Sequence, residues 1–368
     1  MTSATARLLV DTLRLDGAPL AAGARAAWGL VDAPAVAAAV TWEGGALWLL
    51  RRLVESRLED AAPAGLIAAL RKVGVDERAR CLLVDAQTED VLRDLCARGV
   101  PHVLIKGSAR RAAAQRYPYA DARATRDVDV LLPAPSVRLV WESWRAEGWP
   151  YATDPSLTPA EHYHPPPLLG RHRVGVELHE STGHAFPPEE GWRRANDGAA
   201  DLEWHGIAVR VPSATELLWH GLTHAVATGP HGFTLRYFLD GASILGSGVA
   251  VDWDRVAARL DAAEDVDSAR ARAWLGAAAV LAGVALPERV QRGTPPFHVA
   301  RALAWRLTIL GRGPDEGLTA RLLEEGTRSE LGMPVAPVVT GTGAFKQTRR
   351  WVAGRVARAA YRAWRATT

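Results

Sequence analysis

This chain of 368 residues has few cysteines and few lysines, and it lacks long apolar runs. The cysteine count and the missing apolar runs each exclude a class of protein. The two cysteines, Cys81 and Cys96, are too few for the disulfide framework of a small secreted domain. Both lie in segments that read as helical, so we expect buried free thiols in a reducing cytoplasm rather than a disulfide. No run of about 18 uninterrupted apolar residues occurs, which predicts no transmembrane span. Charges interrupt the apolar part of residues 1–17, which argues against a signal peptide and for a cytoplasmic protein.

The few lysines contrast with 41 arginines, a bias typical of a GC-rich genome and hence of a bacterial source. Of the three lysines, Lys106 stands directly before Gly107 and Ser108. A compact ammonium group is not equivalent to a guanidinium group, so this lysine is a candidate for a specific role.

The formal net charge of +3 is unevenly distributed. Residues 346–368 carry seven basic residues and no acidic one, which leaves a net charge of −4 on the rest of the chain. The body of the protein is therefore not expected to bind nucleic acid in general. Residues 345–366 form a basic amphipathic pattern. It would contact an anionic membrane surface, an RNA or an acidic partner, or else dock onto the protein itself.

Periodicity and composition divide the chain into helical and mixed parts. The first hundred residues read as helices, and the middle alternates short apolar runs with helices and turns before the helical pattern returns. The middle part is typical of an α/β or α+β fold. We expect an N-terminal helical segment at 1–100, a sheet-containing core at 101–212, a helical domain at 213–330, and a linker with a basic helix at 331–368.

Caps and periodicity predict the individual elements. Asp32 opens a helix that Gly44 and Gly45 interrupt, and Ser213 with Glu216 forms a capping box. Residues 149–170 are rich in proline and histidine and are expected to form a loop over the site. Further helices are expected at 63–73, at 77–98 with Gly99 as the C-cap, at 136–147, at 235–245 and within 252–312. Strands are expected at 102–105, 127–132, 174–178 and 207–211.

Two aspartates stand inside an apolar run near the middle of the chain. Because side chains alternate along a strand, Asp127 and Asp129 point to the same face, about 7 Å apart. One interpretation is a pair of surface aspartates neutralised by Arg123 and Arg126. The apolar flanks instead predict an internal strand, and buried carboxylates need a partner. A divalent cation between them is the usual solution.

The Lys-Gly-Ser step lies upstream, at the end of another apolar run. At the start of a helix, Gly107 and Ser108 would offer backbone N–H groups to a phosphate. A third carboxylate is expected from a neighbouring strand, and Glu177 in an apolar run fits; the alternative is an outward-facing residue of an edge strand. Metal-binding carboxylates beside a phosphate-binding turn indicate nucleotidyl or phosphoryl transfer.

Several motifs follow one another over about 140 residues. They are Leu-Ile-Lys-Gly-Ser at 104–108, Tyr117-Pro118, Arg-x-x-x-Asp-Val-Asp at 123–129, Glu-Leu-His at 177–179, His224, and Tyr-x-x-Asp at 237–240. With these motifs the chain resembles the uncharacterised nucleotidyltransferase family of the polymerase-β-like superfamily. The resemblance implies an α+β fold in which a small nucleotidyltransferase-type sheet core is flanked by the N-terminal helical segment and the C-terminal helical domain.

The resemblance also implies a substrate and metal ligands. An NTP would be the substrate, and Asp127, Asp129 and Glu177 would hold two Mg²⁺ ions, with Mn²⁺ as the alternative metal. The gap between Ser108 and Asp127 exceeds the superfamily minimum, as is usual in this subfamily. The third acid is Glu where Asp is common, and its extra methylene would shift the second metal.

The other implied roles concern phosphates and the acceptor. Gly107 and Ser108 would hold the nucleotide phosphates, with Lys106 contacting them or holding the turn. Arg123 would stabilise charge on the transferred phosphate or fix the aspartate strand, and Arg126 would help to bind the nucleotide. The candidates for supporting the carboxylates or contacting the acceptor are His179, His224 and Asp240.

The histidines allow more than one interpretation. His220 and His224 are four residues apart on a predicted helix, a spacing that suits zinc. Gly221 stands where a His-Glu-x-x-His motif has its glutamate, so a zinc hydrolase is the less favoured alternative. The histidines of a second group would either be solvated in loops, or contact a substrate phosphate or transfer protons. This group consists of His162, His164, His172, His179 and His184.

These patterns together predict a metal-dependent nucleotidyltransferase that moves a nucleoside monophosphate from an NTP to a hydroxyl or phosphate acceptor. The acceptor stays open among a small molecule, a peptide or protein, and tRNA. A catalytically weak nucleotide-binding or partner-recruiting module of the same fold is the alternative function.

Overall fold

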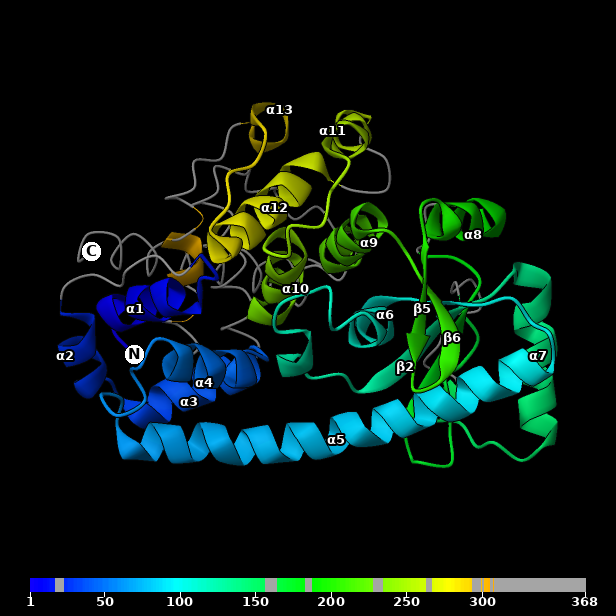
Figure 1. Cartoon of the computed structure of the whole chain (residues 1–368), viewed down its shortest axis with the longest axis horizontal. Coiled ribbons are helices and arrows are strands. Elements are labelled where there is room, and N and C mark those ends of the chain that lie inside the picture. The colour runs from blue at the N-terminus through cyan, green and yellow to red at the C-terminus, as the bar shows by residue number, and fades with distance from the viewer. Residues whose placement is uncertain are drawn as a thin grey trace, which may run out of the picture. The chain divides into compact units, whose positions relative to one another are not determined.

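The computed structural model of the chain describes residues 1–16, 23–155, 164–182, 187–227, 234–262, 267–292, 299, 301–304 and 307 (Figure 1). The predicted linker and basic helix at 331–368 lie outside these residues, as do His162 and His184. The described part combines many helices with two small sheets, so the prediction of a mixed α+β fold is confirmed.

The helices are α1 (Ser3–Leu13), α2 (Ala24–Gly29), α3 (Ala33–Trp42), α4 (Ala46–Glu55), α5 (Ala64–Ala97), α6 (Lys106–Ala112), α7 (Ala134–Ala146), α8 (Pro188–Asn196), α9 (Ala214–Ala227), α10 (Leu235–Leu245), α11 (Trp253–Asp261), α12 (Ser268–Ala282) and α13 (Glu288–Gln291), with a 3₁₀ turn at Ala120–Ala122. The strands are β1 (Val103–Leu104), β2 (Asp127–Leu131), β3 (Leu168–Leu169), β4 (Gly175–His179), β5 (Ala200–Trp204) and β6 (Ile207–Val211).

The chain divides into two compact units. The first contains residues 1–73, 225–242 and 267 onward, and the second contains residues 74–224 and 243–266. The division therefore falls within α5, α9 and α10. The predicted domain boundaries near residues 100, 212 and 330 stay predictions.

Buried polar contacts help to fix the helices of the first unit. The indole N–H of the fully buried Trp28 donates to Thr12 Oγ1 at 3.2 Å, which satisfies its one donor. The carboxylate of the buried Glu43 accepts from the backbone N–H of Leu235 at 2.6 Å. Glu43 thereby satisfies one of the N–H groups that the start of α10 leaves without an intrahelical partner.

The predicted break in the first long helix is confirmed. Asp32 caps α3 by accepting from the backbone N–H of Ala35 at 3.1 Å. The chain then turns at Gly44, whose φ of 73° lies in the left-handed region that favours glycine, and α4 follows Gly45.

The prediction of two helices at 63–73 and 77–98 is wrong, because one helix of 34 residues spans both. Gly74 lies buried in its interior. One glycine inside a helix costs about 1 kcal/mol relative to alanine, which burial on either side outweighs. The predicted C-cap is confirmed: Gly99 has a φ of 66°, and the N–H of Val100 reaches back to the Leu95 carbonyl at 2.9 Å.

The four-stranded sheet of the second unit has the order β1-β2-β4-β3. Strands β2 and β4 run parallel at the centre, and β1 and β3 flank them in the antiparallel direction. Helix α6 packs against β1 and β2, and α7 packs against β4. Val103, Ile105 and Leu131 form a buried cluster with Ala195 of α8, and Trp192 packs against it. The central pair β2 and β4 is therefore held from several sides.

The four predicted strands are confirmed, with ends that differ by at most two residues. Two further strands were not expected. Strand β3 lies inside the predicted loop at 149–170 and has only two residues, too few to show a periodicity. Strand β5 pairs with β6 through a two-residue turn in which His205 and Gly206 both have positive φ, as a tight hairpin of this type requires. Two of its five residues are exposed and none is buried, so its apolar signal is weak.

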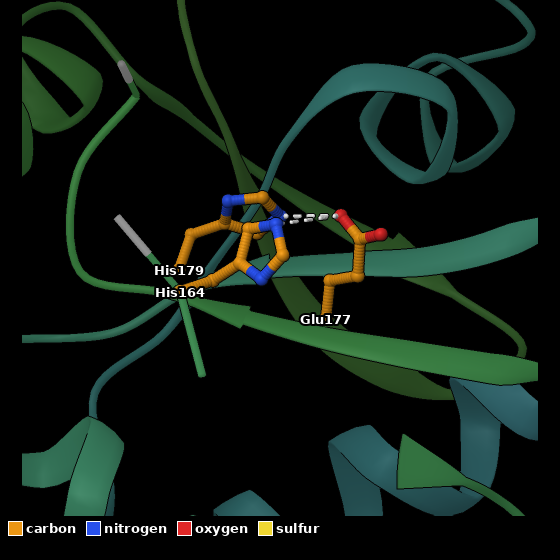
Figure 2. Close-up of side chains that lie close together, drawn as sticks. All are labelled: His164, Glu177 and His179. Atoms are coloured by element: carbon orange, nitrogen blue, oxygen red, sulfur yellow. Dashed lines mark ion pairs between the residues drawn. The ribbon is translucent and has the colours of Figure 1, made fainter. Parts of the chain in front are cut away.

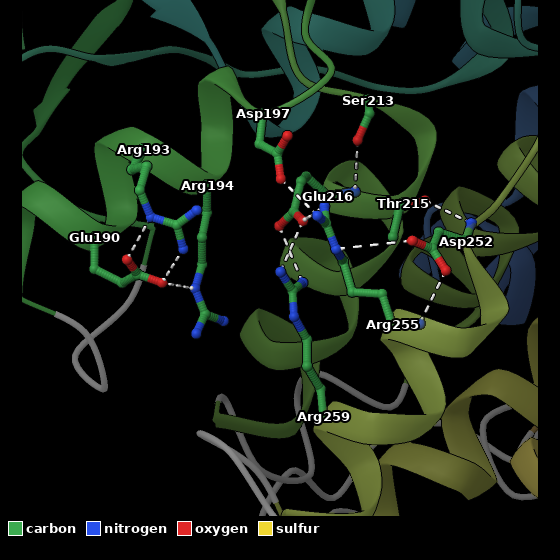
Figure 3. A network of polar contacts seen from close by, with 10 residues as sticks. All are labelled: Glu190, Arg193, Arg194, Asp197, Ser213, Thr215, Glu216, Asp252, Arg255 and Arg259. Carbon is green, nitrogen blue, oxygen red and sulfur yellow. Dashed lines mark hydrogen bonds and ion pairs between the residues drawn. The ribbon is translucent and has the colours of Figure 1, made fainter.

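The capping box at the start of α9 forms only in part (Figure 3). Ser213 Oγ accepts from the backbone N–H of Glu216 at 3.3 Å, which confirms the N-cap. The Glu216 carboxylate instead binds two arginines of α11. Arg259 donates to both of its oxygens, at 3.0 and 2.8 Å, and Arg255 donates to one at 3.2 Å. This cluster joins α9 to α11.

The remaining expectations concern thiols and membranes. Both cysteines are free, as predicted, and Cys81 is buried. Cys96 is exposed near the C-terminal end of α5, so the prediction of a buried thiol is wrong there. Among the described residues, no helix combines the length and hydropathy that a membrane span requires.

Candidate active site

The aspartates of β2 lie on an internal strand, between β1 and β4. Val128 and Val130 are fully buried on the opposite face, and Asp129 is only 2 % exposed. In the parallel pair with β4, Asp129 stands directly beside Glu177. The structure therefore brings three carboxylates, two from β2 and one from β4, onto the same face of the central strands.

Lys106 links two of these carboxylates. Its Nζ lies 2.8 Å from Asp129 Oδ1 and 3.2 Å from Glu177 Oε2. Only Ile105 separates β1 from α6, and Lys106 takes the left-handed φ of 48° in this abrupt turn. A left-handed conformation is costly for a residue with a Cβ atom, and such strain clusters at functional sites. The turn is what points the ammonium group at the carboxylates.

Two histidines complete the cluster (Figure 2). His179, fully buried on β4, places Nε2 3.0 Å from Asp129 Oδ1 and 3.2 Å from Glu177 Oε2. His164 places Nε2 3.7 Å from the same Glu177 oxygen. Its ring packs edge to face against that of His179, with the ring centroids 4.9 Å apart. Figure 2 shows both imidazole rings beside the Glu177 carboxylate. Solvation of a loop is thus the wrong interpretation for both histidines.

The electrostatics differ between the three acids. Burial alone would raise the pKa of Asp129, but the charge of Lys106 and the contact with His179 hold it well below its usual range. Burial is likewise outweighed at Glu177, whose pKa the hydrogen bond with His179 helps to lower to about 2. Burial and the charges of the other two acids raise the pKa of Asp127 to about 6. The cluster therefore holds more negative charge than Lys106 balances.

Gly107 and Ser108 lie in the first turn of α6, and both are buried. Ser108 Oγ accepts a hydrogen bond from the backbone N–H of Asp129 at 3.0 Å, which ties α6 to β2. A Cβ atom at Gly107 would press into the Arg123 guanidinium group and approach Thr125 Cγ2 to 2.9 Å. No residue larger than glycine fits there without moving these neighbours.

The two arginines before β2 have different surroundings. Arg123 is buried, and its Nη1 donates to Thr125 Oγ1 at 3.0 Å and to the Ala124 carbonyl at 3.4 Å. These contacts agree with the second of its two implied roles, fixing the aspartate strand. The Arg126 side chain is 64 % exposed and lies 3.9 Å from Glu77, so its proposed contact with a nucleotide stays a prediction.

On α9, His220 is buried and His224 is partly buried, with ring centroids 6.5 Å apart. Burial and the nearby charge of Lys106 lower the pKa of His220 well below its usual range and that of His224 to about 4, so both rings are neutral at pH 7. Neither belongs to a metal-binding cluster among the described residues, where the one such cluster contains His164, Glu177 and His179. A zinc hydrolase at this pair therefore lacks support. Asp240 is buried on α10 in the first unit, and its role stays a prediction.

Comparison with protein-family profiles shows to which family the chain belongs. The profile of the uncharacterised nucleotidyltransferases matches residues 30–275, about two thirds of the chain. The chain belongs to this family. Searches of the curated proteins and of the solved structures returned no significant match. Membership supports a general role in nucleotidyl transfer with an NTP as substrate.

The nucleotidyltransferase family match and the geometry coincide at β2 and β4, which both lie within the matched residues. Sequence reasoning did not place His164 in the cluster. The sequence carries one sign of its position, the run of three prolines that follows it. A residue before proline favours an extended backbone, and this extended segment continues into β3. His172, by contrast, lies apart from the cluster, with Nε2 3.1 Å from Asp90 Oδ2.

Proposed function

We propose that the protein is a divalent-metal-dependent nucleotidyltransferase that moves a nucleoside monophosphate from an NTP to a hydroxyl or phosphate acceptor. The observation that carries this proposal is the register that sets Asp129 beside Glu177, with Asp127 two residues away on the same face. Three fixed carboxylates on two central strands are the arrangement that in-line phosphoryl displacement with metal ions needs.

The donor set fits a divalent cation. Three carboxylates face one ammonium group, and burial together with the charges of the other two acids raises the pKa of Asp127. Carboxylate oxygens are the ligands that Mg²⁺ and Mn²⁺ prefer, and Asp127, Asp129 and Glu177 would hold the ion or ions. When bound, such an ion neutralises phosphate charge and orients the triphosphate.

The chain's own residues would position the nucleotide. The first N–H groups of a helix have no intrahelical partner, so those of Gly107 and Ser108 are candidates to bind phosphate oxygens. Lys106 would shift part of its contact from the carboxylates to a phosphate oxygen as negative charge arrives. Arg123 would keep β2 in place. Catalysis would then consist of positioning and charge compensation.

The acceptor is a small molecule, a peptide or protein, or tRNA, and the experiment that tests the proposal also separates these classes. The purified full-length chain with Mg²⁺ is given ATP, GTP, CTP and UTP in turn, each radiolabelled at the α-phosphate, in a cell lysate. Transfer of label to one fraction, with release of pyrophosphate, is expected. Asp129→Asn should abolish it, and the matched change Asp201→Asn, at an exposed pair on β5, should not. Absence of label from every fraction with all four nucleotides would refute the proposal.

A second candidate is a nucleotide-binding module without turnover. It is favoured by one observation: Lys106 already bridges Asp129 and Glu177, so these two acids are partly neutralised by the protein itself. The same labelled nucleotides distinguish the two. The module would retain NTP in equilibrium dialysis and release no pyrophosphate, with Lys106→Met changing affinity only.

The localisation and the surface partner are part of the same proposal. We place the enzyme in the cytoplasm, where NTP is abundant. The contact of residues 345–366 with an anionic surface lies outside the described residues and stays a prediction.

A further inference from the structure

We propose that His164, Glu177 and His179 form a binding site for a transition-metal dication of the Zn²⁺ class, separate from the aspartates of β2. The inference rests on the proposed function in that Glu177 would serve both, but it is tested by metal binding alone. It would make the third carboxylate part of a mixed imidazole–carboxylate site.

The ligand atoms already converge. One ring nitrogen of each histidine and one oxygen of Glu177 all lie within 4.8 Å of one another. Glu177 Oε2 is 3.2 Å from His179 Nε2 and 3.7 Å from His164 Nε2. In a tetrahedral zinc site with bonds of about 2.1 Å, ligand atoms lie roughly 3.4 Å apart. Two of the three separations are therefore within a few tenths of an ångström of the required value.

The backbone fixes two of the three ligands. Glu177 and His179 are two residues apart on β4, so their side chains emerge on the same face of a central strand. His179 is fully buried, and Glu177 is 19 % exposed. His164 enters from the segment that leads to β3, the neighbour of β4. Because two of the three ligands are fixed on one central strand, they lose little conformational entropy on binding.

His164 is also held in the tautomer that a metal ligand needs. Its Nδ1 lies 2.9 Å from the Pro165 carbonyl oxygen, which can only accept, so Nδ1 carries the proton. Nε2 then presents its lone pair toward Glu177. This arrangement, in which the second ring nitrogen donates to a carbonyl, is the usual support of a metal-bound histidine.

The donor chemistry selects the ion. Two imidazoles and one carboxylate suit Zn²⁺ and its neighbours, whereas Mg²⁺ prefers oxygen ligands and dehydrates reluctantly. Lys106 is the competitor, with Nζ 3.2 Å from Glu177 Oε2 and 3.5 Å from His179 Nε2. On metal binding, the ammonium group would keep its 2.8 Å contact with Asp129 and leave the other two.

The test titrates metal-free, full-length protein with Co²⁺, a spectroscopic substitute for Zn²⁺, and follows visible absorption and equilibrium dialysis. One Co²⁺ per chain is expected, with absorption bands of a nitrogen-containing site that excess Mg²⁺ does not remove and Zn²⁺ does. His164→Ala should raise the Kd at least tenfold. The matched control is His172→Ala, which removes another part-buried histidine beside a carboxylate and should leave the Kd unchanged.

The outcomes separate this inference from the proposed function. Co²⁺ binding without nucleotidyl transfer would support the site and refute the function; Asp129→Asn should likewise keep Co²⁺ while losing turnover. Loss of the bands on adding Mg²⁺, or equal affinity in His164→Ala and wild type, would overturn the site. Circular dichroism checks folding, and His164→Gln replaces the alanine variant if the latter does not fold.

Discussion

Two ion clusters in the second unit bury carboxylates by different means. Around Glu216, two guanidinium groups supply three hydrogen bonds to the two oxygens, and the exposed Asp197 satisfies a further donor of Arg255 (Figure 3). Around Asp129 and Glu177, one flexible ammonium group and one imidazole share several contacts, and Asp127 adds another negative charge (Figure 2 shows the Glu177 side).

The difference lies in how completely each charge is matched. A guanidinium fork matches a carboxylate in shape, so the Glu216 cluster is closed and serves to hold α9 on α11. The β2 and β4 cluster keeps an excess of negative charge on a rigid strand pair, at a cost in stability. The metal ion of the proposed function would neutralise this excess.

The largest expected effect comes from Asp129. We expect Asp129→Asn to lower nucleotidyl transfer by roughly a hundredfold to a thousandfold, because it removes one of the charges that would hold the metal. Initial rates at saturating NTP measure it. If this variant retained half of the wild-type rate, the reaction would take place at a site that does not include Asp129.

The Glu216 cluster should show a loss of stability instead. Arg259→Met leaves a buried carboxylate with half of its guanidinium partners, and we expect a loss of about 3 kcal/mol in the free energy of unfolding. Denaturant titration measures it. Adding Glu216→Leu in the same chain should recover most of the loss, since two apolar residues replace a buried ion pair at little cost. No recovery in the double variant would show that the arginine acts through other contacts.

Removal of the Asp127 charge should raise the stability of the metal-free protein, because the pKa of Asp127 in the folded state is about 6 and thus above the usual value of 3.8. At Asp127 the folded protein then binds more protons than the unfolded chain between about pH 4 and 6, so this residue destabilises the metal-free protein less as the pH falls through the window; His220 and His224, with lowered pKa values, act in the opposite direction. Asp127→Asn should remove this dependence and stabilise the metal-free protein at pH 7 by about 1 to 2 kcal/mol.

Thermal unfolding in chelator at several pH values measures the Asp127 effect. Below about pH 4 the sign reverses, because Asp129 and Glu177 have lowered pKa values and their stabilisation is lost as they take up protons. A stability difference between wild type and Asp127→Asn that does not shrink from pH 6 to pH 4 would contradict the assignment.

The smallest effect is expected at the surface pair of α8. The Arg193 side chain is 64 % exposed and binds Glu190 three residues earlier. Arg193→Ala should leave the free energy of unfolding nearly unchanged, since exposed pairs gain little in water. The same denaturant titration provides the value, and a loss comparable to that of Arg259→Met would remove the distinction between buried and exposed clusters.

The sequence predicted what depends on short-range pattern. Strand alternation placed Asp127 and Asp129 on one face, and the cap at Asp32 and the turn at Gly44 were visible as single residues. The continuation of α5 across Gly74 was missed, because burial on both sides of one glycine is a tertiary effect.

The assembly of the site could be predicted only in part. That an acid from another strand would face the aspartates was expected, but the partnership of Asp129 with Glu177 depends on the sheet order. The position of Lys106 between them requires a left-handed turn at a residue other than glycine, which no propensity favours. The position of His164 in the cluster depends on β3, a strand of two residues that is too short to show a periodicity in the sequence.

Gly107 also limits how the protein can diversify. Since a Cβ atom there would meet Arg123 and Thr125, position 107 of the stretch 106–108 admits no residue larger than glycine unless the segment before β2 moves. Natural drift or laboratory selection toward a new acceptor would therefore have to work through other segments, such as 164–170. A mutant library that spares the first stretch and randomises the second would keep the phosphate chemistry constant while sampling recognition.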